Sequence, residues 1–243
     1  MRRVTSSAPR GPATAQHVAP TPTSALAHPP TRVKPLLRGV VHQVSFFLAI
    51  PCVAWLIHSA PRGPAAIAAA VYGLSLLLLL GTSALYHRKH WGPRARLRMG
   101  RLDHSAIFVL IAGSYTPITL FGVGGAYGQS LCAAIWVGAL LGIAQTLFWP
   151  SAPRWLHVGI YVVLGWMGAL GLAGEVRTTG LSTALLHVFG GVLYTLGAVT
   201  YARKRPDPFP KVFGYHEIFH VLVVLACGCL FEVVRRCLVS AST

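Results

Sequence analysis

Seven long apolar runs restrict this chain to folds that cross a membrane. With 54% hydrophobic and 11% charged side chains, its 243 residues cannot bury their apolar surface in a water-soluble core. Each run has roughly the 17 to 25 residues that a helix needs to span a bilayer. We therefore predict an all-α integral membrane bundle of seven transmembrane helices. The expected helices are Val40 to Ile57, Ala65 to Tyr86, Ser105 to Phe121, Ser130 to Phe148, Leu156 to Leu172, Leu181 to Tyr201 and Ile218 to Val234.

The basic residues predict how the bundle is oriented. A net charge of +16 would suggest a nucleic-acid partner for a soluble protein, but here the charges sort by side of the membrane. With the N-terminus in the cytoplasm, 17 of the 21 Lys and Arg residues lie on cytoplasmic segments. The others are Arg62, Arg177, Arg235 and Arg236. We expect a cytoplasmic N-terminus, an external C-terminus and no nucleic-acid partner.

The two ends of the chain are expected to lie outside the bundle. Residues 1–37 are rich in Pro, Ala and Thr, contain no acid and show no hydrophobic period. This composition indicates a disordered cytoplasmic tail, and an organellar targeting segment has a similar one. Residues 38–238 are expected to form the membrane domain and residues 239–243 a short C-terminal tail. The five cysteines lie in or beside apolar runs, as buried small hydrophobic residues do.

Polar side chains gather where four expected helices meet the cytoplasm. His216 and His220 lie four residues apart on one helix face, where two imidazoles can bind one metal ion. The second apolar run brings Ser83 and His87 to the same depth, and Asp103 lies just before the third run. His87, His216 and His220 would form a zinc site with a fourth position open to water. Asp103 would accept the proton of that water, and Ser83 would hold the water or an oxyanion.

Simpler or weaker roles are open for several polar residues. Asp103 would also suit the cap of the third helix, or would offset the neighbouring arginines. His42 and His104 lie at the right depth to orient a ligand or the acid. His187 lies toward the outer side of the sixth expected helix, too far away to join the group. A bundle whose histidines bind no metal is the remaining alternative.

The chain resembles a known family in three segments. The hemolysin III family is similar in S-A-L-Y-H, in R-L-D-H-S-A-I-F-V-L-I-A-G-S-Y-T-P and in H-E-I-F-H, and the resemblance covers about residues 38 to 235. This bacterial family is related to the progestin and adipoQ receptors and, more distantly, to alkaline ceramidases. The resemblance implies seven transmembrane helices and a set of one Ser, one Asp and three His, of which the three histidines hold zinc in eukaryotic relatives. Here the matching residues are Ser83, Asp103, His87, His216 and His220.

The start of the first expected helix departs from the family pattern. It reads R-G-V-V-H-Q-V-S, whereas bacterial relatives usually carry a Glu, an Asn and a Thr-His pair, so that only His42 matches. Any role that the family gives to the acidic residue therefore does not carry over to this chain. The family name reflects a cytolytic phenotype, so the resemblance also implies a pore-forming hemolysin.

These patterns favour a zinc-dependent hydrolase that cleaves amides or esters of membrane lipids and serves membrane homeostasis at the cell membrane. Zinc is then the cofactor and a membrane lipid the partner, while neither the lipid nor the oligomeric state follows from the sequence. A different class of function is a pore-forming cytolysin, or a receptor or channel, in which structural zinc ties the second and seventh helices together.

A third candidate function is a membrane zinc protease. His216 and His220 match H-E-x-x-H, with Glu217 as the general base. This function leaves His87, Ser83 and Asp103 idle, and the later acid on the same helix, Glu232, lies about 24 Å beyond His216 at 1.5 Å per residue. The protease explains less of the sequence than the lipid hydrolase does.

Overall fold

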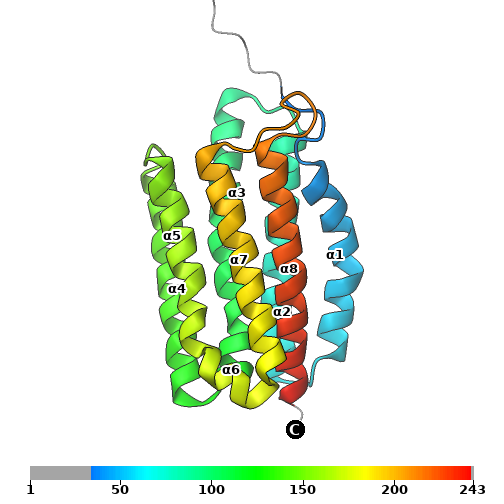
Figure 1. Cartoon of the computed structure of the whole chain (residues 1–243), viewed down its shortest axis with the longest axis vertical. Helices are drawn as coiled ribbons and strands as arrows, with labels where there is room; N and C mark the ends of the chain where they lie inside the picture. The colour runs from blue at the N-terminus through cyan, green and yellow to red at the C-terminus, as the bar shows by residue number, and fades with distance from the viewer. Residues whose placement is uncertain (1–33, 242–243) are drawn as a thin grey trace, which may run out of the picture. The chain divides into compact units, whose positions relative to one another are not determined.

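The computed structural model describes residues 34–241, and within that range the chain is a bundle of long helices. Seven helical segments of this range are long and apolar enough to cross a membrane, which confirms the predicted number (Figure 1). The N-terminal tail expected at residues 1–37 lies outside the described residues except for residues 34–37. At the other end, the last helix continues to Ser240, beyond the expected end of the membrane domain at residue 238.

Eight α-helices make up the seven segments of the described range. Two short stretches interrupt them: a π-helix at Ile118–Val123 (η1) extends α3, and a 3₁₀ turn at Met167–Gly171 (η2) joins α5 to α6. The helices are α1 Val40–Ser59, α2 Pro64–Arg88, α3 Pro93–Pro117, α4 Gly125–Phe148, α5 Arg154–Trp166, α6 Leu172–Thr179, α7 Leu181–Arg203 and α8 Tyr215–Ser240.

The third helix begins earlier than its apolar run predicts. It starts at Pro93, where a proline costs nothing because the first N–H of a helix has no partner within it. Asp103 therefore lies about 15 Å inside the helix at 1.5 Å per residue, and Gly92 is the residue before the first turn. Asp103 therefore does not cap α3, and the capping role considered for it is wrong. The apolar run predicted a later start because hydropathy detects only the part of a helix that suits lipid, and the first turns of α3 are basic.

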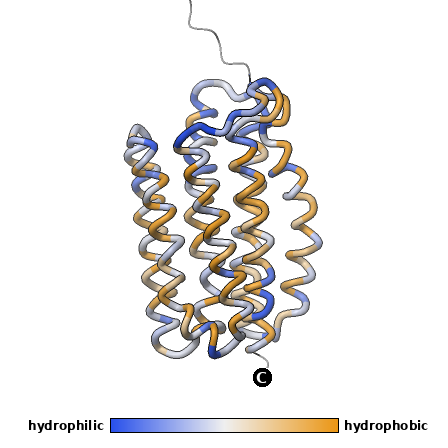
Figure 2. The backbone as a smooth tube through the Cα atoms, in the orientation of Figure 1, coloured by the Kyte–Doolittle hydropathy of each residue, from blue (hydrophilic) through white to orange (hydrophobic). Residues whose placement is uncertain are grey.

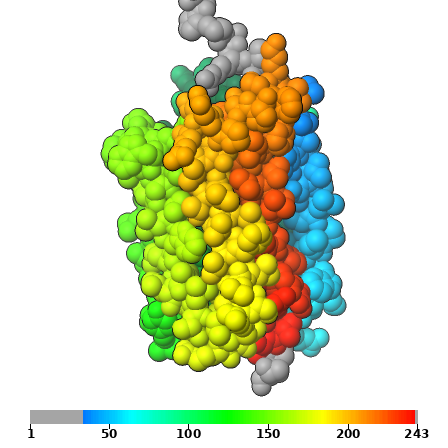
Figure 3. Space-filling model, in the orientation of Figure 1, coloured from blue at the N-terminus to red at the C-terminus, as the bar shows by residue number. Residues whose placement is uncertain are grey.

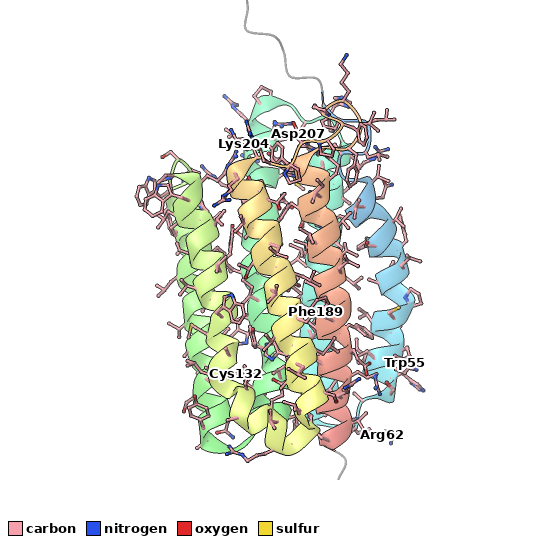
Figure 4. All side chains as sticks on the ribbon, viewed as in Figure 1. Trp55, Arg62, Cys132, Phe189, Lys204 and Asp207 are labelled. Atoms are coloured by element: carbon pink, nitrogen blue, oxygen red, sulfur yellow. The ribbon has the colours of Figure 1, made fainter. Side chains whose placement is uncertain are left out.

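One end of the bundle is distinctly hydrophilic. Figure 2 shows hydrophobic colour along the helices and hydrophilic segments at the end that holds the α2–α3 and α7–α8 connections. Lys204 and Asp207 lie at this end, whereas Trp55 and Arg62 lie toward the other (Figure 4). We call the first of these the basic end and define it by residues 34–39, 88–93 and 203–214. The charge distribution predicts that it faces the cytoplasm.

The last helix holds the bundle together. Helix α8 packs against α1, α2, α3, α6 and α7, with α1 at one edge of the bundle and α4 and α5 at the other (Figure 1). Figure 3 shows α7 and α8 in contact along one face. Small residues allow close approach elsewhere: a Cβ on Gly113 of α3 would lie 2.3 Å from Ser75 Oγ of α2. The start of α8 lies beside the end of α2, where Nε2 of His216 is 3.2 Å from Nε2 of His87.

Candidate metal centre

Three histidines from two helices meet at the basic end. His87 lies in the last turn of α2, and His216 and His220 lie in the first two turns of α8. Each offers one ligand nitrogen, and these nitrogens all lie within 4.8 Å of one another. The three residues are 8%, 8% and 3% exposed. The structure thus brings together the three imidazoles that were predicted to form one site, although His87 and His216 are 129 residues apart along the chain.

The spacing of two of these nitrogens matches that expected around a tetrahedral zinc ion. Zinc binds histidine nitrogen at about 2.0 to 2.1 Å, so two ligand nitrogens on a tetrahedron lie about 3.3 Å apart. The Nε2 atoms of His216 and His87 are 3.2 Å apart. His220 Nε2 is buried and has no hydrogen-bond partner among the described residues. Three imidazole nitrogens are a donor set that zinc prefers, and they leave a fourth position open.

His42 contacts the candidate metal ligand His220. Its Nε2 lies 2.9 Å from Nδ1 of His220, and the two ring centroids are 3.9 Å apart. When Nδ1 of His220 carries the hydrogen, His42 accepts it and Nε2 of His220 is left as the ligand atom. A partner of this kind sets the tautomer and the ring orientation of a metal ligand. The orienting position considered for His42 therefore has a specific geometric basis in this fold.

Asp103 and Ser83 complete the group at the same level. Asp103 Oδ2 lies 3.7 Å from Nε2 of His87, and the carboxyl group is buried in the third turn of α3. Ser83, one turn before His87 on α2, is within hydrogen-bonding reach of this carboxyl group. All five predicted site residues are thus neighbours, and a carboxylate stands beside the histidine nitrogens as proton-transfer chemistry requires.

Glu217 lies beside His216 in sequence, but its side chain accepts hydrogen bonds from Arg38 and Gly214. Its Oε1 accepts a hydrogen bond from Arg38 Nε at 2.5 Å, and its Oε2 accepts one from the Gly214 N–H at 2.9 Å. The second bond caps the start of α8. The first ties the segment before α1 to α8. Both oxygens are therefore engaged, and Glu217 is a structural acid in this arrangement.

Sequence reasoning missed Arg38 and Gly39. Gly39 has φ +82°, and a Cβ at this position would lie 2.7 Å from Cβ of His87. Only glycine fits a left-handed backbone that presses directly on a candidate ligand. The available signal was the R-G pair three residues before His42, but nothing local in the sequence connects that pair to His87 or Glu217.

His104 takes a different environment from the one considered for it. Its ring centroid lies 6.1 Å from that of His157, and its backbone carbonyl accepts a hydrogen bond from Tyr161 at 3.3 Å. No hydrogen bond joins His104 to the three clustered histidines within the described range. His104 points toward α5, whereas Asp103, the preceding residue, points toward α2.

Cations surround the approach to the centre from the basic end. Partial burial lowers the pKa of Lys34 from its ordinary value, and the guanidinium groups of Arg96, Arg88 and Arg38 lower it further. Arg154 lies over the ring of Tyr201 at 4.8 Å, and the Tyr201 ring lies 5.6 Å from that of His216. Positive charge is therefore concentrated at this end of the bundle.

The fold and the centre together define a heptahelical membrane protein with a buried three-imidazole cluster at one end. Residues 31–231 match a family model described as haemolysin-III related. The chain is 32% identical over 200 residues to hemolysin-3 of Bacillus cereus, which covers 81% of this chain and 88% of that protein. It therefore belongs to the haemolysin III family, as its motifs predicted, and is a multi-pass membrane protein.

Two further relatives show how widely the sequence is shared. The hemolysin-3 homolog of Bacillus subtilis (strain 168) is 32% identical over 200 residues, with 81% of this chain and 90% of that protein covered. The adiponectin receptor protein of Drosophila melanogaster is 29% identical over 175 residues, which cover 63% of this chain and 38% of the receptor. The relation to receptors of the adiponectin class that the motifs implied is confirmed.

Proposed function

We propose that this protein is a zinc-dependent hydrolase of membrane lipid amides or esters. One observation carries the proposal: three buried imidazoles, with ligand nitrogens within 4.8 Å of one another, stand next to a buried carboxyl group near the ends of membrane-length helices. Zinc, when bound, lowers the pKa of a water molecule to about 7 and polarises a carbonyl group. His87, His216 and His220 would hold the ion, with His42 orienting His220.

Asp103 is positioned to act as the general base and acid of the proposed hydrolysis. Its Oδ2 atom is close to the ligand nitrogens but, at 3.7 Å from His87 Nε2, is not consumed by a hydrogen bond to them. Ser83 would orient the carboxyl group and leave one oxygen free to accept a proton from water and pass it to the leaving amine or alkoxide. Burial of both side chains keeps bulk water away from this transfer.

The location of the centre favours a lipid as substrate. Ester and amide carbonyls of lipids lie at the boundary between headgroups and hydrocarbon, and the centre lies at the ends of membrane-length helices. The surrounding helices expose many large apolar side chains, as a lipid-facing surface does. The positive charge at the basic end suits the negative charge of a lipid surface, so it requires no nucleic-acid partner.

Two other functions have less support. A protease of the H-E-x-x-H type needs Glu217 as its base, but both oxygens of this residue are engaged by Arg38 and Gly214. A receptor or channel with structural zinc has one observation in its favour, because an ion held by His87 and His216 would tie α2 to α8. That function gives Asp103 and Ser83 no task.

The first test is the metal content of detergent-purified protein with a tag that contains no histidine. We expect about one zinc per chain in the wild type and its loss in His87→Ala and His216→Ala. His90→Ala is the matched control, because His90 lies three residues after His87 at the basic end but is exposed. Wild-type protein without bound metal would contradict the hydrolase and the structural-zinc functions together.

The second test is acyl-chain release from lipid amides and esters in vesicles. We expect hydrolysis by the wild type and strongly reduced hydrolysis by Asp103→Asn, which should still contain zinc. Zinc-loaded wild-type protein that releases no acyl chain from either class would exclude the hydrolase. If the same preparation conducts ions in planar bilayers, the channel takes its place.

A further inference from the structure

A second buried polar cluster lies in the half of the bundle opposite the basic end. It joins Tyr115 of α3, Glu175 of α6 and His187 of α7, which are 6%, 0% and 4% exposed. Figure 1 shows α6 far from the α7–α8 connection, so this cluster is separate from the candidate metal centre. Ionisable side chains buried within membrane helices are costly and generally have a function.

Four residues form a continuous chain of three hydrogen bonds. Glu175 Oε2 lies 2.7 Å from His187 Nδ1, and His187 Nε2 lies 3.1 Å from the Tyr115 hydroxyl oxygen. The Tyr115 hydroxyl in turn lies 2.5 Å from the Gly165 carbonyl oxygen at the end of α5. The chain thus links four helices through one carboxyl group, one imidazole and one phenol.

The direction of each hydrogen bond follows from which atoms can donate. A backbone carbonyl only accepts, so the single phenol hydrogen of Tyr115 is used by Gly165. The Tyr115 oxygen must then accept from His187, and Nε2 of His187 carries a hydrogen. A neutral imidazole with hydrogen on Nε2 has a bare Nδ1, and an ionised carboxylate has no hydrogen to give it. The 2.7 Å contact between Nδ1 and Oε2 therefore requires one additional proton.

We propose that Glu175 and His187 form a buried proton-binding site that holds one proton in this arrangement. The proton lies on Glu175 beside a neutral imidazole, or on His187 beside a carboxylate, and the pair is electrically neutral in either case. Neutrality is what a low-dielectric interior favours. This site is independent of the zinc hydrolase proposed above, because none of its atoms belongs to the metal centre.

Release of the proton would change the link between α3 and α5. The remaining hydrogen of His187 would move to Nδ1 to face the charged carboxylate, and Nε2 would become an acceptor. The Tyr115 hydroxyl hydrogen would then turn from Gly165 to His187. The tyrosine ring itself is held in place, since a Cβ on Gly168 would lie 1.9 Å from it. The bond lost is the one to Gly165, two residues before the 3₁₀ turn that joins α5 to α6.

Among the described residues, Glu175 forms an ion pair with His187 and with no Lys or Arg side chain. Oε1 of Glu175 has no hydrogen-bond partner among the described residues. Near the pair, α8 presents the Cys237 thiol, which adjoins Gly122 and Glu175, and Arg236, which reaches Thr183 of α7. The further titratable groups on α3, α6 and α8 of this half are Tyr115, Arg177, Glu232 and Arg235.

The direct test is the ¹⁵N resonance of the His187 ring in wild-type protein reconstituted in lipid nanodiscs, assigned by its loss in His187→Asn. We expect Nε2 of His187 to be protonated at neutral pH, whichever atom holds the shared proton. Nε2 without hydrogen and Nδ1 with hydrogen at neutral pH would overturn the proposal, because Tyr115 would then be the donor. The measurement is made on the wild-type protein, and His187→Asn is the only variant that has to fold.

A second test compares Glu175→Gln with Glu232→Gln. The glutamine amide can donate to Nδ1 of a neutral His187 but takes up no proton, so the Tyr115–Gly165 bond should persist at all pH values. Glu232 is the matched control, since it is an acid of the same half held by Arg235 and Arg236 at the surface. Amide exchange across residues 165–171, corrected for the intrinsic effect of pH, should rise about fivefold at high pH, as expected for one lost hydrogen bond. This increase in exchange should occur in the wild type and in Glu232→Gln but not in Glu175→Gln. Equal increases in all three proteins would refute the proposal that proton release from the Glu175–His187 pair breaks the Tyr115–Gly165 bond.

Discussion

Replacement of His42 by leucine tests whether the metal centre depends on the tautomer of His220. Leucine is similar in size to the imidazole ring and fills the buried position, but it cannot accept a hydrogen bond. The Nδ1–H of His220, now 2.9 Å from His42 Nε2, would lose its partner in a buried site. An unpaired buried donor costs about 1 to 3 kcal/mol, and loss of a partner that orients a metal ligand typically weakens metal binding by about 10- to 100-fold.

The assay is zinc affinity measured by competition with a chromophoric chelator on purified protein. We expect His42→Leu to bind zinc about 10- to 100-fold more weakly than the wild type. His42→Gln should recover much of the loss, because its side-chain oxygen can accept from Nδ1–H. His58→Leu is the control, since His58 lies on the same helix but is exposed near its other end. Equal affinity of His42→Leu and His58→Leu would refute the orienting role of His42.

Three further predictions concern the same end of the bundle, and a fourth concerns its orientation in the membrane. Asp103→Asn should reduce lipid hydrolysis about 10²- to 10⁴-fold, the usual contribution of a general base, with zinc content unchanged by mass spectrometry. Gly39→Ala should lower zinc affinity in the chelator assay, because the new Cβ would displace His87; a bound ion held as tightly as in the wild type would contradict this. Glu217→Gln should keep zinc and hydrolysis but lower the thermal unfolding midpoint, since it weakens the pair with Arg38 and the cap of α8; loss of hydrolysis with zinc retained would instead favour the protease. Reporter fusions should place the N-terminus in the cytoplasm and the C-terminus outside, and the reverse result would refute the orientation inferred from charge.

Much of the fold could be predicted from local patterns. The apolar composition of each run is enough to make its insertion into lipid favourable. Seven runs therefore predict seven spans without any knowledge of their packing. The i, i+4 spacing of His216 and His220 likewise places both on one face of a helix wherever that helix lies. Helix bounds were less predictable, because the basic turns from Pro93 onward are helical without being apolar. That difference moved Asp103 from the start of α3 to its interior.

The contacts that shape the two buried clusters depend on how distant segments pack. His42 and His220 are 178 residues apart, Arg38 and Glu217 are 179 apart, and Tyr115 and His187 are 72 apart. Hydropathy and spacing describe one segment at a time, so neither can say which helix lies beside which. Composition and motifs established the membrane class, the family and the candidate ligands. The packing of α8 against α1, α2 and α3 and of α6 and α7 against α3 then selected the partners of each polar side chain, because a buried donor or acceptor is stable only where another helix supplies its partner.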